Sequence, residues 1–361
     1  MRKLQLCLLV CLTLLLAACT SSNTGNTTTT PTAVPVNGFG TAANHVHSLI
    51  TLPDADHTLV LATHYGIFRS QDQGATWQQT AGGPGQSMQS VMTYQLSYNP
   101  LDPQRLYVLT YIQGAPNPHA STLGLYTSGD SGKTWQMAIA DSSVTTSSIF
   151  FAQAGNDSPS EVYIYLSSLG PLGLKVSKDN GQHFAQAGSA LPFGTALGML
   201  ALPGQPGHLL VFGNNGIATT SDGGAHWQTS SSVQGGIFEM TTAGANNPIY
   251  ASGDAGVYAS TDGGKTFNLV SQESYGALAA SAQQPDVLYG KLALGVYRST
   301  NGGKTWQELP VLKISQQALT GDVLSVDSTD ATQVYLAISY PVAVYQFQST
   351  NSSWKSVTPS V

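Results

Sequence analysis

The sequence predicts an all-β fold, a single seven-bladed β-propeller, and three observations support this prediction. Charged residues make up only 9% of the chain, against roughly 25% in an average globular protein, while glycine occurs 38 times. One short motif recurs along the chain. Its copies begin at residues 70, 128, 177, 220, 260, 299 and 349, a spacing typical of propeller blades rather than of sandwich strands.

The chain opens with a targeting segment. After a basic start, residues 4–16 form an apolar run that is too short to span a bilayer stably. The small residues Ala17 and Ala18 precede Cys19, and this sequence resembles the lipobox of bacterial lipoproteins. The resemblance implies that residues 1–18 are a signal peptide and that Cys19 becomes the diacylated first mature residue, anchored to the membrane on its extracytoplasmic side. An ordinary secretory signal cleaved nearby is the alternative.

A flexible tether is expected between the lipid and the folded body. Residues 19–44 are rich in Ser, Thr, Asn and Pro and contain almost no large apolar side chains, so they cannot bury a core. All three cysteines, Cys7, Cys11 and Cys19, precede or begin this tether. The body, residues 45–361, therefore has no disulfide and no thiolate metal site, and its stability must come from packing.

Each repeat combines four short strands in the same order. An apolar strand such as 59–62 is followed by a glycine-containing turn and a second strand such as 66–68. The motif makes the next turn, and its aromatic residue opens another strand. An earlier strand, such as 48–51, completes the four.

The recurring motif has a structural interpretation. In its first copy, from Ser70 to Trp77, the Ser and Asp side chains can hydrogen-bond the backbone of their own turn, and the Gly can take a positive φ. The aromatic residue then packs between blades. The acidic or amide position is Asp72, Asp130, Asp179, Asp222, Asp262 and Asn301, and the aromatic position is Trp77, Trp135, Phe184, Trp227, Phe267 and Trp306. A worn seventh copy ends at Trp354.

These copies resemble the Asp-box, or BNR repeat, which many sialidases and other propellers carry. The resemblance covers about residues 45–361 and implies the fold rather than an activity. A calcium-loop interpretation fails, because each copy offers one carboxylate and lacks the further acidic ligands such a loop needs.

Catalysis of the sialidase type is not favoured by the sequence. That family uses three arginines that converge on a substrate carboxylate. The mature chain offers Arg69, Arg105 and Arg298, and Arg69 and Arg298 occupy the same slot before the box serine of different blades. Other glycosidases need two facing carboxylates. Glu239 on an inner strand and Asp322 in blade seven are candidates for such a pair. We favour the alternative interpretation, in which they are isolated polar residues around a solvated channel.

A histidine cluster is the most suggestive local feature. His45 and His47 lie two residues apart and can share one side of a strand, and His64 and Tyr65 occupy the next turn of the same blade. This opening resembles bacterial Asp-box propellers that are named as glycosylhydrolases without an established substrate. Three interpretations stay open: a polar ligand-lining cluster, a metal site and structural histidines. We select His45, His47, His64, Tyr65 and Glu239 as candidate ligand-lining residues, and we expect no catalytic residue, metal or other cofactor.

The function we favour is non-catalytic binding. A net charge of -6 and the absence of a basic patch argue against nucleic acid as a partner. A resemblance to photosystem II assembly factor propellers implies protein binding, although this acidic chain departs from their basic face. We therefore expect a membrane-anchored scaffold for glycan or protein ligands, held on the face opposite the boxes, where 113–120 and 312–321 form long loops. The alternatives are a glycoside hydrolase of the sialidase-like superfamily and an assembly factor for a membrane protein complex.

The anchoring hypothesis predicts the behaviour of one variant. Cys19→Ser removes the expected acylation site, so the protein should move from the membrane fraction to the soluble fraction after washing without detergent. Immunoblots of the two fractions measure the change. A variant that stays with the membranes would show that the lipobox interpretation is wrong.

Overall fold

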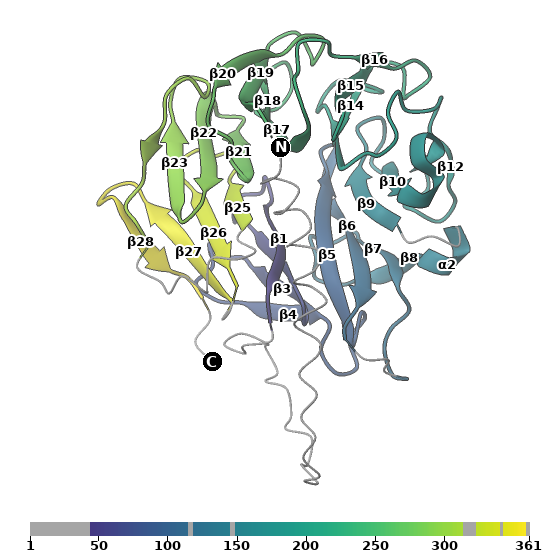
Figure 1. The fold of residues 1–361 in the computed structure, drawn as a ribbon. Helices are drawn as coiled ribbons and strands as arrows, with labels where there is room; N and C mark the ends of the chain where they lie inside the picture. Colours follow the sequence, from purple (N-terminus) through teal and green to yellow (C-terminus); the bar gives the residue numbers. More distant parts are fainter. Residues whose placement is uncertain (1–43, 115–117, 145–148, 313–322, 340–341, 359–361) are drawn as a thin grey trace, which may run out of the picture.

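The computed structural model describes residues 44–114, 118–144, 149–312, 323–339 and 342–358. Seven four-stranded antiparallel sheets follow one another around a ring in chain order (Figure 1), which confirms the predicted seven-bladed propeller. Cys19, most of the tether and nearly all of the 312–321 loop lie outside the described residues. Within the described ranges, no helix is long and apolar enough to cross a membrane.

Each blade consists of four consecutive strands, and the first strands of neighbouring blades contact one another around the axis. The strands are β1 (Val46–Thr51), β2 (Leu59–Thr63), β3 (Gly66–Ser70), β4 (Gln78–Ala81), β5 (Val91–Asn99), β6 (Asp102–Ile112), β7 (Gly124–Ser128), β8 (Gln136–Ala140), β9 (Ile149–Ala154), β10 (Val162–Leu166), β11 (Leu174–Ser177), β12 (Ala185–Gln186), β13 (Gly198–Ala201), β14 (Leu209–Gly213), β15 (Gly216–Thr220), β16 (Gln228–Thr229), β17 (Ile237–Thr242), β18 (Ile249–Gly253), β19 (Gly256–Ser260), β20 (Asn268–Ser271), β21 (Ala277–Ser281), β22 (Gln284–Leu292), β23 (Gly295–Ser299), β24 (Gln307–Glu308), β25 (Val323–Val326), β26 (Val334–Ile338), β27 (Ala343–Gln348) and β28 (Ser353–Ser356). In the described part of the chain, α2 (Asp141–Val144) connects blade two to blade three, and η1 (Ser167–Leu172) lies between β10 and β11 of blade three.

The second strands of the blades form the core. Every residue of β2, β10, β14, β18 and β26 is buried, because each sheet packs against a neighbouring blade on both faces. Such strands read as continuous apolar runs rather than as alternating ones. One core cluster joins Val60 and Ala62 of blade one to Leu106, Val108 and Trp135 of blade two. The core of this propeller therefore lies between blades.

The box turns have the predicted hydrogen bonds. In the first box, Ser70 Oγ donates to Asp72 Oδ1 at 2.8 Å and accepts the Gly74 amide at 2.8 Å. Asp72 also accepts the amide of Thr76 at 2.8 Å and its hydroxyl at 2.6 Å, and Trp77 Nε1 donates to the Gly74 carbonyl at 3.0 Å. Gly74 has a φ of +90°, which a side chain would strain. The same pattern recurs in the following boxes, and in the third and fourth of the seven His183 and His226 replace Thr as partners of the aspartate.

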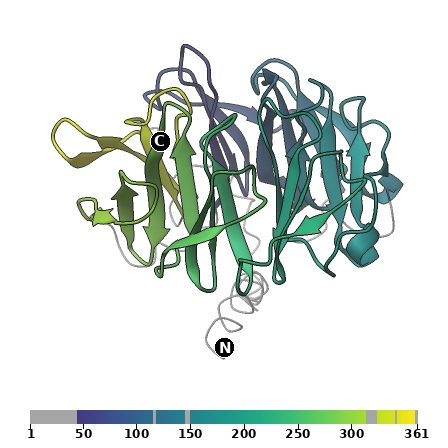
Figure 2. The same ribbon diagram turned by 90° about the horizontal axis from the view of Figure 1, so that it is seen from above.

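The ring closes without sharing a strand between the first and last blades. Figure 2 shows the purple strands of blade one beside the yellow strands of blade seven. Trp77 Nε1 also donates to the Val357 carbonyl at 2.8 Å, and the hydroxyls of Thr51 and Ser325 lie 2.9 Å apart. His57 Nδ1 lies 2.6 Å from Oδ2 of the fully buried Asp327. Side-chain packing and these polar contacts therefore hold the closure.

The boxes predict unequal costs for two tryptophan substitutions. Trp135 is 7% exposed and belongs to the core between blades one and two, so Trp135→Ala should lower the free energy of unfolding by about 3–5 kcal/mol. Trp354 follows the worn box and is less buried, and Trp354→Ala should cost less. Urea unfolding of both variants measures the difference. Equal losses would contradict the role that we assign to the intact box.

Candidate functional site

One face of the ring gathers the candidate residues. Each blade starts with its innermost strand, so the first strands all begin at the same face, and the turns between second and third strands lie there too. We call this face the mouth face; the box turns lie on the opposite face. His45 and His47 stand at the start of β1, and His64 and Tyr65 form the β2–β3 turn. The structure therefore brings these four predicted residues together.

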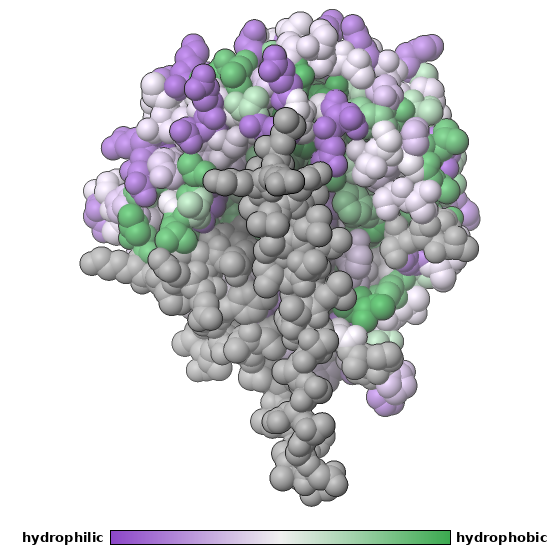
Figure 3. Space-filling model, in the orientation of Figure 1, coloured by the Kyte–Doolittle hydropathy of each residue, from purple (hydrophilic) through white to green (hydrophobic). Residues whose placement is uncertain are grey.

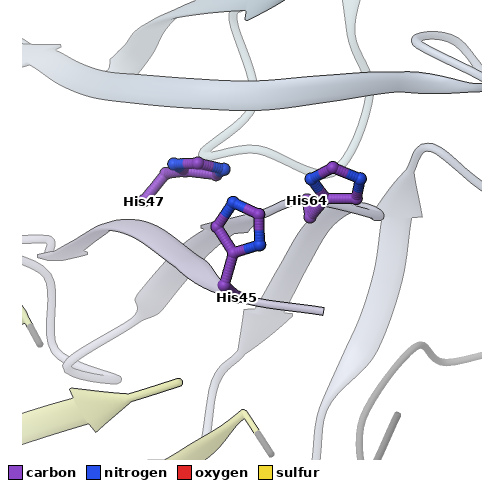
Figure 4. A group of neighbouring side chains, drawn as sticks. All are labelled: His45, His47 and His64. Atoms are coloured by element: carbon purple, nitrogen blue, oxygen red, sulfur yellow. The ribbon is translucent and has the colours of Figure 1, made fainter. Parts of the chain in front are cut away.

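The three imidazoles converge (Figure 4). The ring centroid of His45 lies 4.4 Å from that of His47 and 4.6 Å from that of His64. One ring nitrogen from each histidine lies within 4.8 Å of the others. Tyr65 packs edge-on against His64 with centroids 5.0 Å apart. The cluster therefore combines three nitrogen ligands with an aromatic wall.

A β-bulge places His47. Val46 pairs with Thr63 and Ser48 pairs with Ala62, which leaves His47 without a partner in the ladder. Bulges of this kind re-aim a side chain and are common beside functional sites. The backbone around the bulge is fixed, because the Val46 amide donates to Ser339 Oγ at 2.9 Å.

The same irregularity recurs in other blades. The first strands β5, β9 and β17 also carry an extra residue near their starts, and each of these bulges contains an aromatic side chain. The bulged aromatic residues are Tyr94, Phe150 and Phe238. Equivalent positions of a propeller lie at equal distance from its axis, so the bulges direct aromatic side chains to the rim of the channel mouth.

The histidines continue into an aromatic arc. The centroid of His47 lies 5.0 Å from that of Tyr94, which in turn lies 5.1 Å from that of Tyr111. Tyr111 lines a cavity of about 180 Å³ between blades two and three, together with Met92, Asp141 and Ile149. The mouth face of blades one to three therefore offers a run of rings beside a cavity.

Burial keeps the imidazoles of His47 and His64 neutral. It lowers the pKa of His47 to about 3, with smaller contributions from the nearby imidazoles of His45 and His64. Burial, followed by the imidazole of His45, lowers the pKa of His64 to about 4. His47 Nε2 and His64 Nδ1 are both buried, and no described residue forms a hydrogen bond with either atom. A neutral imidazole carries one nitrogen lone pair that can accept a hydrogen bond or bind a metal.

Glu239 lies apart from the histidines, on β17 of blade five, directly after a bulge. Burial raises the pKa of its carboxyl to about 8, and the amide of Met240, which donates to Oε1 at 3.2 Å, opposes the shift. No charged group of the described chain contributes to this shift. Asp322, the expected counterpart in blade seven, lies outside the described residues.

The arginines contact different parts of the ring. Arg69 Nε donates to the carbonyl of Ser131 in the box of blade two at 2.8 Å. The guanidinium carbon of Arg298 lies 5.9 Å from the ring centroid of Tyr289, within blade six. Arg105 lies on β6 of blade two. Arg298 thus makes its contact in blade six, whereas Arg69 contacts blade two and Arg105 lies in blade two. The positions of Arg69 and Arg298 in different repeats predict this separation.

Sequence reasoning missed Tyr94, Tyr111 and Phe150. A bulge depends on how a strand pairs with its neighbour, and no local residue pattern marks it. One signal was available. His47, Tyr94, Phe150 and Phe238 each place a ring within the first four residues of a first strand.

Comparisons with known proteins agree with this architecture. The family model of the BNR/Asp-box repeat matches residues 297–308. The chain is thus a seven-bladed β-propeller that carries a BNR/Asp-box repeat. Comparison with curated proteins gives no match.

Solved structures share the fold at low sequence identity. The GH74 enzyme of Niastella koreensis has a TM-score of 0.68 and 16% identity over 89% of this chain and 55% of its own. The GH74 xyloglucanase of Xanthomonas campestris has a TM-score of 0.63 and 16% identity over 90% of this chain and 55% of its own. The chain thus spans about half the length of these enzymes. YCF48 from Cyanidioschyzon merolae has a TM-score of 0.59 and 15% identity over 88% of this chain and 98% of its own.

The raised pKa of Glu239 predicts a pH-dependent stability. The unfolded chain releases the proton near pH 4.5, whereas the folded protein holds it until about pH 8. The contribution of this group to the free energy of unfolding is therefore full below pH 4.5 and is lost as the pH rises toward 8. Glu239→Gln removes this loss.

The melting temperature of Glu239→Gln relative to wild type should rise between about pH 5 and about pH 8. Thermal unfolding followed by circular dichroism checks this. Glu273→Gln, which changes an exposed carboxyl in the connection between blades five and six, is the matched control and should show no such trend. If the two variants behave alike, burial does not hold the Glu239 proton.

Proposed function

We propose that this propeller is a membrane-anchored, extracytoplasmic binding protein that holds a polypeptide ligand on the mouth face of blades one to three without transforming it. The observation that carries this proposal is the set of exposed apolar side chains beside the aromatic arc and the cavity. Anchoring rests on the lipobox resemblance at Cys19.

Five exposed apolar side chains lie on the mouth face of blades two and three. Tyr94 and Phe150 are each 40% exposed, and Ile112 at the end of β6 is 62% exposed. Leu169 and Leu172 on η1, in the corresponding turn of blade three, are 42% and 54% exposed. Figure 3 shows green apolar patches among hydrophilic ones over β5–β12, with further green patches on the other side of the ring. Apolar groups left in water in this way are typical of binding surfaces.

A polypeptide suits this surface better than a sugar. Aromatic rings can stack on either ligand, whereas exposed Ile and Leu side chains gain most from apolar side chains on a partner. Among the structures of similar fold, one is of YCF48 bound to a D1 peptide, with a TM-score of 0.57 and 12% identity. An assembly factor for a membrane protein complex is one form that a polypeptide-binding function can take.

The carboxylates argue against glycoside hydrolysis. That reaction uses two carboxyl groups that face each other across the bond. The shift at Glu239 arises from burial without a charged partner in the described chain, and Asp141 at the cavity accepts the Ile149 amide at 2.9 Å. A glycan ligand remains the second candidate, because the rings of His47, Tyr94 and Tyr111 form a stacking surface and GH74 enzymes share the fold.

A selection experiment tests the ligand class. The full-length chain in detergent is used to select peptides from a displayed random library, and binding of the selected peptides is measured by calorimetry. Replacing both Ile112 and Phe150 with Ser should weaken binding at least about tenfold, because each change removes an apolar contact. Leu269→Ser, at a residue 47% exposed on the outer strand β20, is the control and should leave binding unchanged.

The same protein is applied to a glycan array and assayed for released sugars. Glycan binding without peptide binding would contradict the polypeptide proposal and favour the second candidate. Sugar release would contradict the non-catalytic proposal and restore the glycoside hydrolase alternative.

A further inference from the structure

The three histidines form a compact group of potential metal ligands. His45, His47 and His64 contribute one nitrogen each, and these atoms lie within 4.8 Å of one another. No carboxylate or thiolate of the described chain belongs to the cluster. Imidazole ligands suit Zn²⁺, Cu²⁺ and Ni²⁺, whereas Ca²⁺ and Mg²⁺ prefer oxygen.

Hydrogen bonds hold the backbone of the cluster in place. The His64 amide donates to the His45 carbonyl at 2.9 Å, which joins the two segments directly. Gln113 Nε2, from blade two, donates to the His64 carbonyl at 2.7 Å. By contrast, His47 Nε2 and His64 Nδ1 are buried without a hydrogen-bond partner among the described residues. A buried polar atom left in this state is costly, so two such atoms in one cluster point to a ligand.

We propose that His45, His47 and His64 bind one Zn²⁺ ion. This departs from our expectation from the sequence that the chain holds no metal. Ligand atoms of a tetrahedral zinc site with bonds of about 2.0–2.1 Å lie about 3.4 Å apart, so the rings must turn slightly inward from their present separation. The geometry permits this, because the bonds within the three side chains can rotate while the backbone remains fixed.

Three protein ligands leave a coordination position open. Zinc sites of this kind keep a water or an exchangeable ligand in the fourth position, unlike structural sites with four protein ligands. The centroid of Tyr94 lies 5.0 Å from that of His47, so the aromatic arc begins beside the ion. The proposal does not depend on the polypeptide ligand, because it rests on the histidines alone.

Calorimetric titration tests the site directly. The full-length chain in detergent is stripped with a chelator, dialysed and titrated with Zn²⁺, and with Ca²⁺ for comparison. We expect one Zn²⁺ per chain with a micromolar or lower Kd and no Ca²⁺ binding. Loss of an outer hydrogen-bond partner of a metal ligand weakens metal binding about 10–100-fold. His47→Gln and His64→Gln each remove a ligand itself, so each should weaken Zn²⁺ binding by more than this.

The control is a histidine on the opposite face. His226 pairs with Asp222 in a box, at a position where other boxes carry Thr, so His226→Thr preserves the turn and should bind Zn²⁺ like the wild type. Circular dichroism checks that each variant is folded.

X-ray absorption on the wild-type complex decides the outcome if a variant fails to fold. Three imidazole nitrogens at about 2.0–2.1 Å from zinc are expected. Fewer than three, no binding at about 1 mM Zn²⁺, or unchanged binding by the folded His47 and His64 variants would overturn the proposal.

Discussion

Each blade of this protein must bury both faces of its sheet, and no blade can do so alone. The second strands are apolar on both sides, and β2 and β26 are buried throughout because blades one and seven meet. Closure of the ring is therefore a condition for the stability of every blade. The chain meets it with side-chain contacts, of which the bond from Trp77 to the Val357 carbonyl is one. The box thus closes its own turn and also joins the two ends of the propeller.

Because of this constraint, the two faces of the ring differ in how freely their residues can vary. On the box face, a repeated set of hydrogen bonds fixes each turn and leaves little freedom. On the mouth face, the inner strands β1, β5, β9 and β17 carry bulges near their starts, and the side chains they present can change without disturbing the core. His47, Tyr94 and Phe150 occupy such positions. A repeated scaffold with one variable face is the usual arrangement for binding.

The fold could be predicted from the sequence because the box is a local structure. Ser70, Asp72, Gly74 and Trp77 interact within one turn, so their spacing alone identifies it. Ring closure could not be predicted in the same way. The contacts of Thr51 with Ser325 and of His57 with Asp327 join residues from opposite ends of the folded body.

The candidate site was predictable only in part. His45 and His47 are neighbours in the chain, and the blade pattern places the turn that contains His64 beside them. Tyr94 reaches the histidines through a bulge in another blade, and the cavity at Tyr111 forms between blades two and three. Both depend on pairing and packing between segments that no local pattern describes. The seven-bladed fold could thus be predicted from interactions within single turns, whereas the extent of the site depends on contacts between blades of the closed ring.

The central claim is that function resides on the mouth face. Photocrosslinking in intact cells tests it most directly, with a photoreactive residue placed either at Ile112 on the mouth face or at Leu101, which is 47% exposed in the β5–β6 turn of the box face. The account predicts a discrete adduct from position 112 that is absent from position 101. An adduct from position 101, with none from position 112, would contradict it.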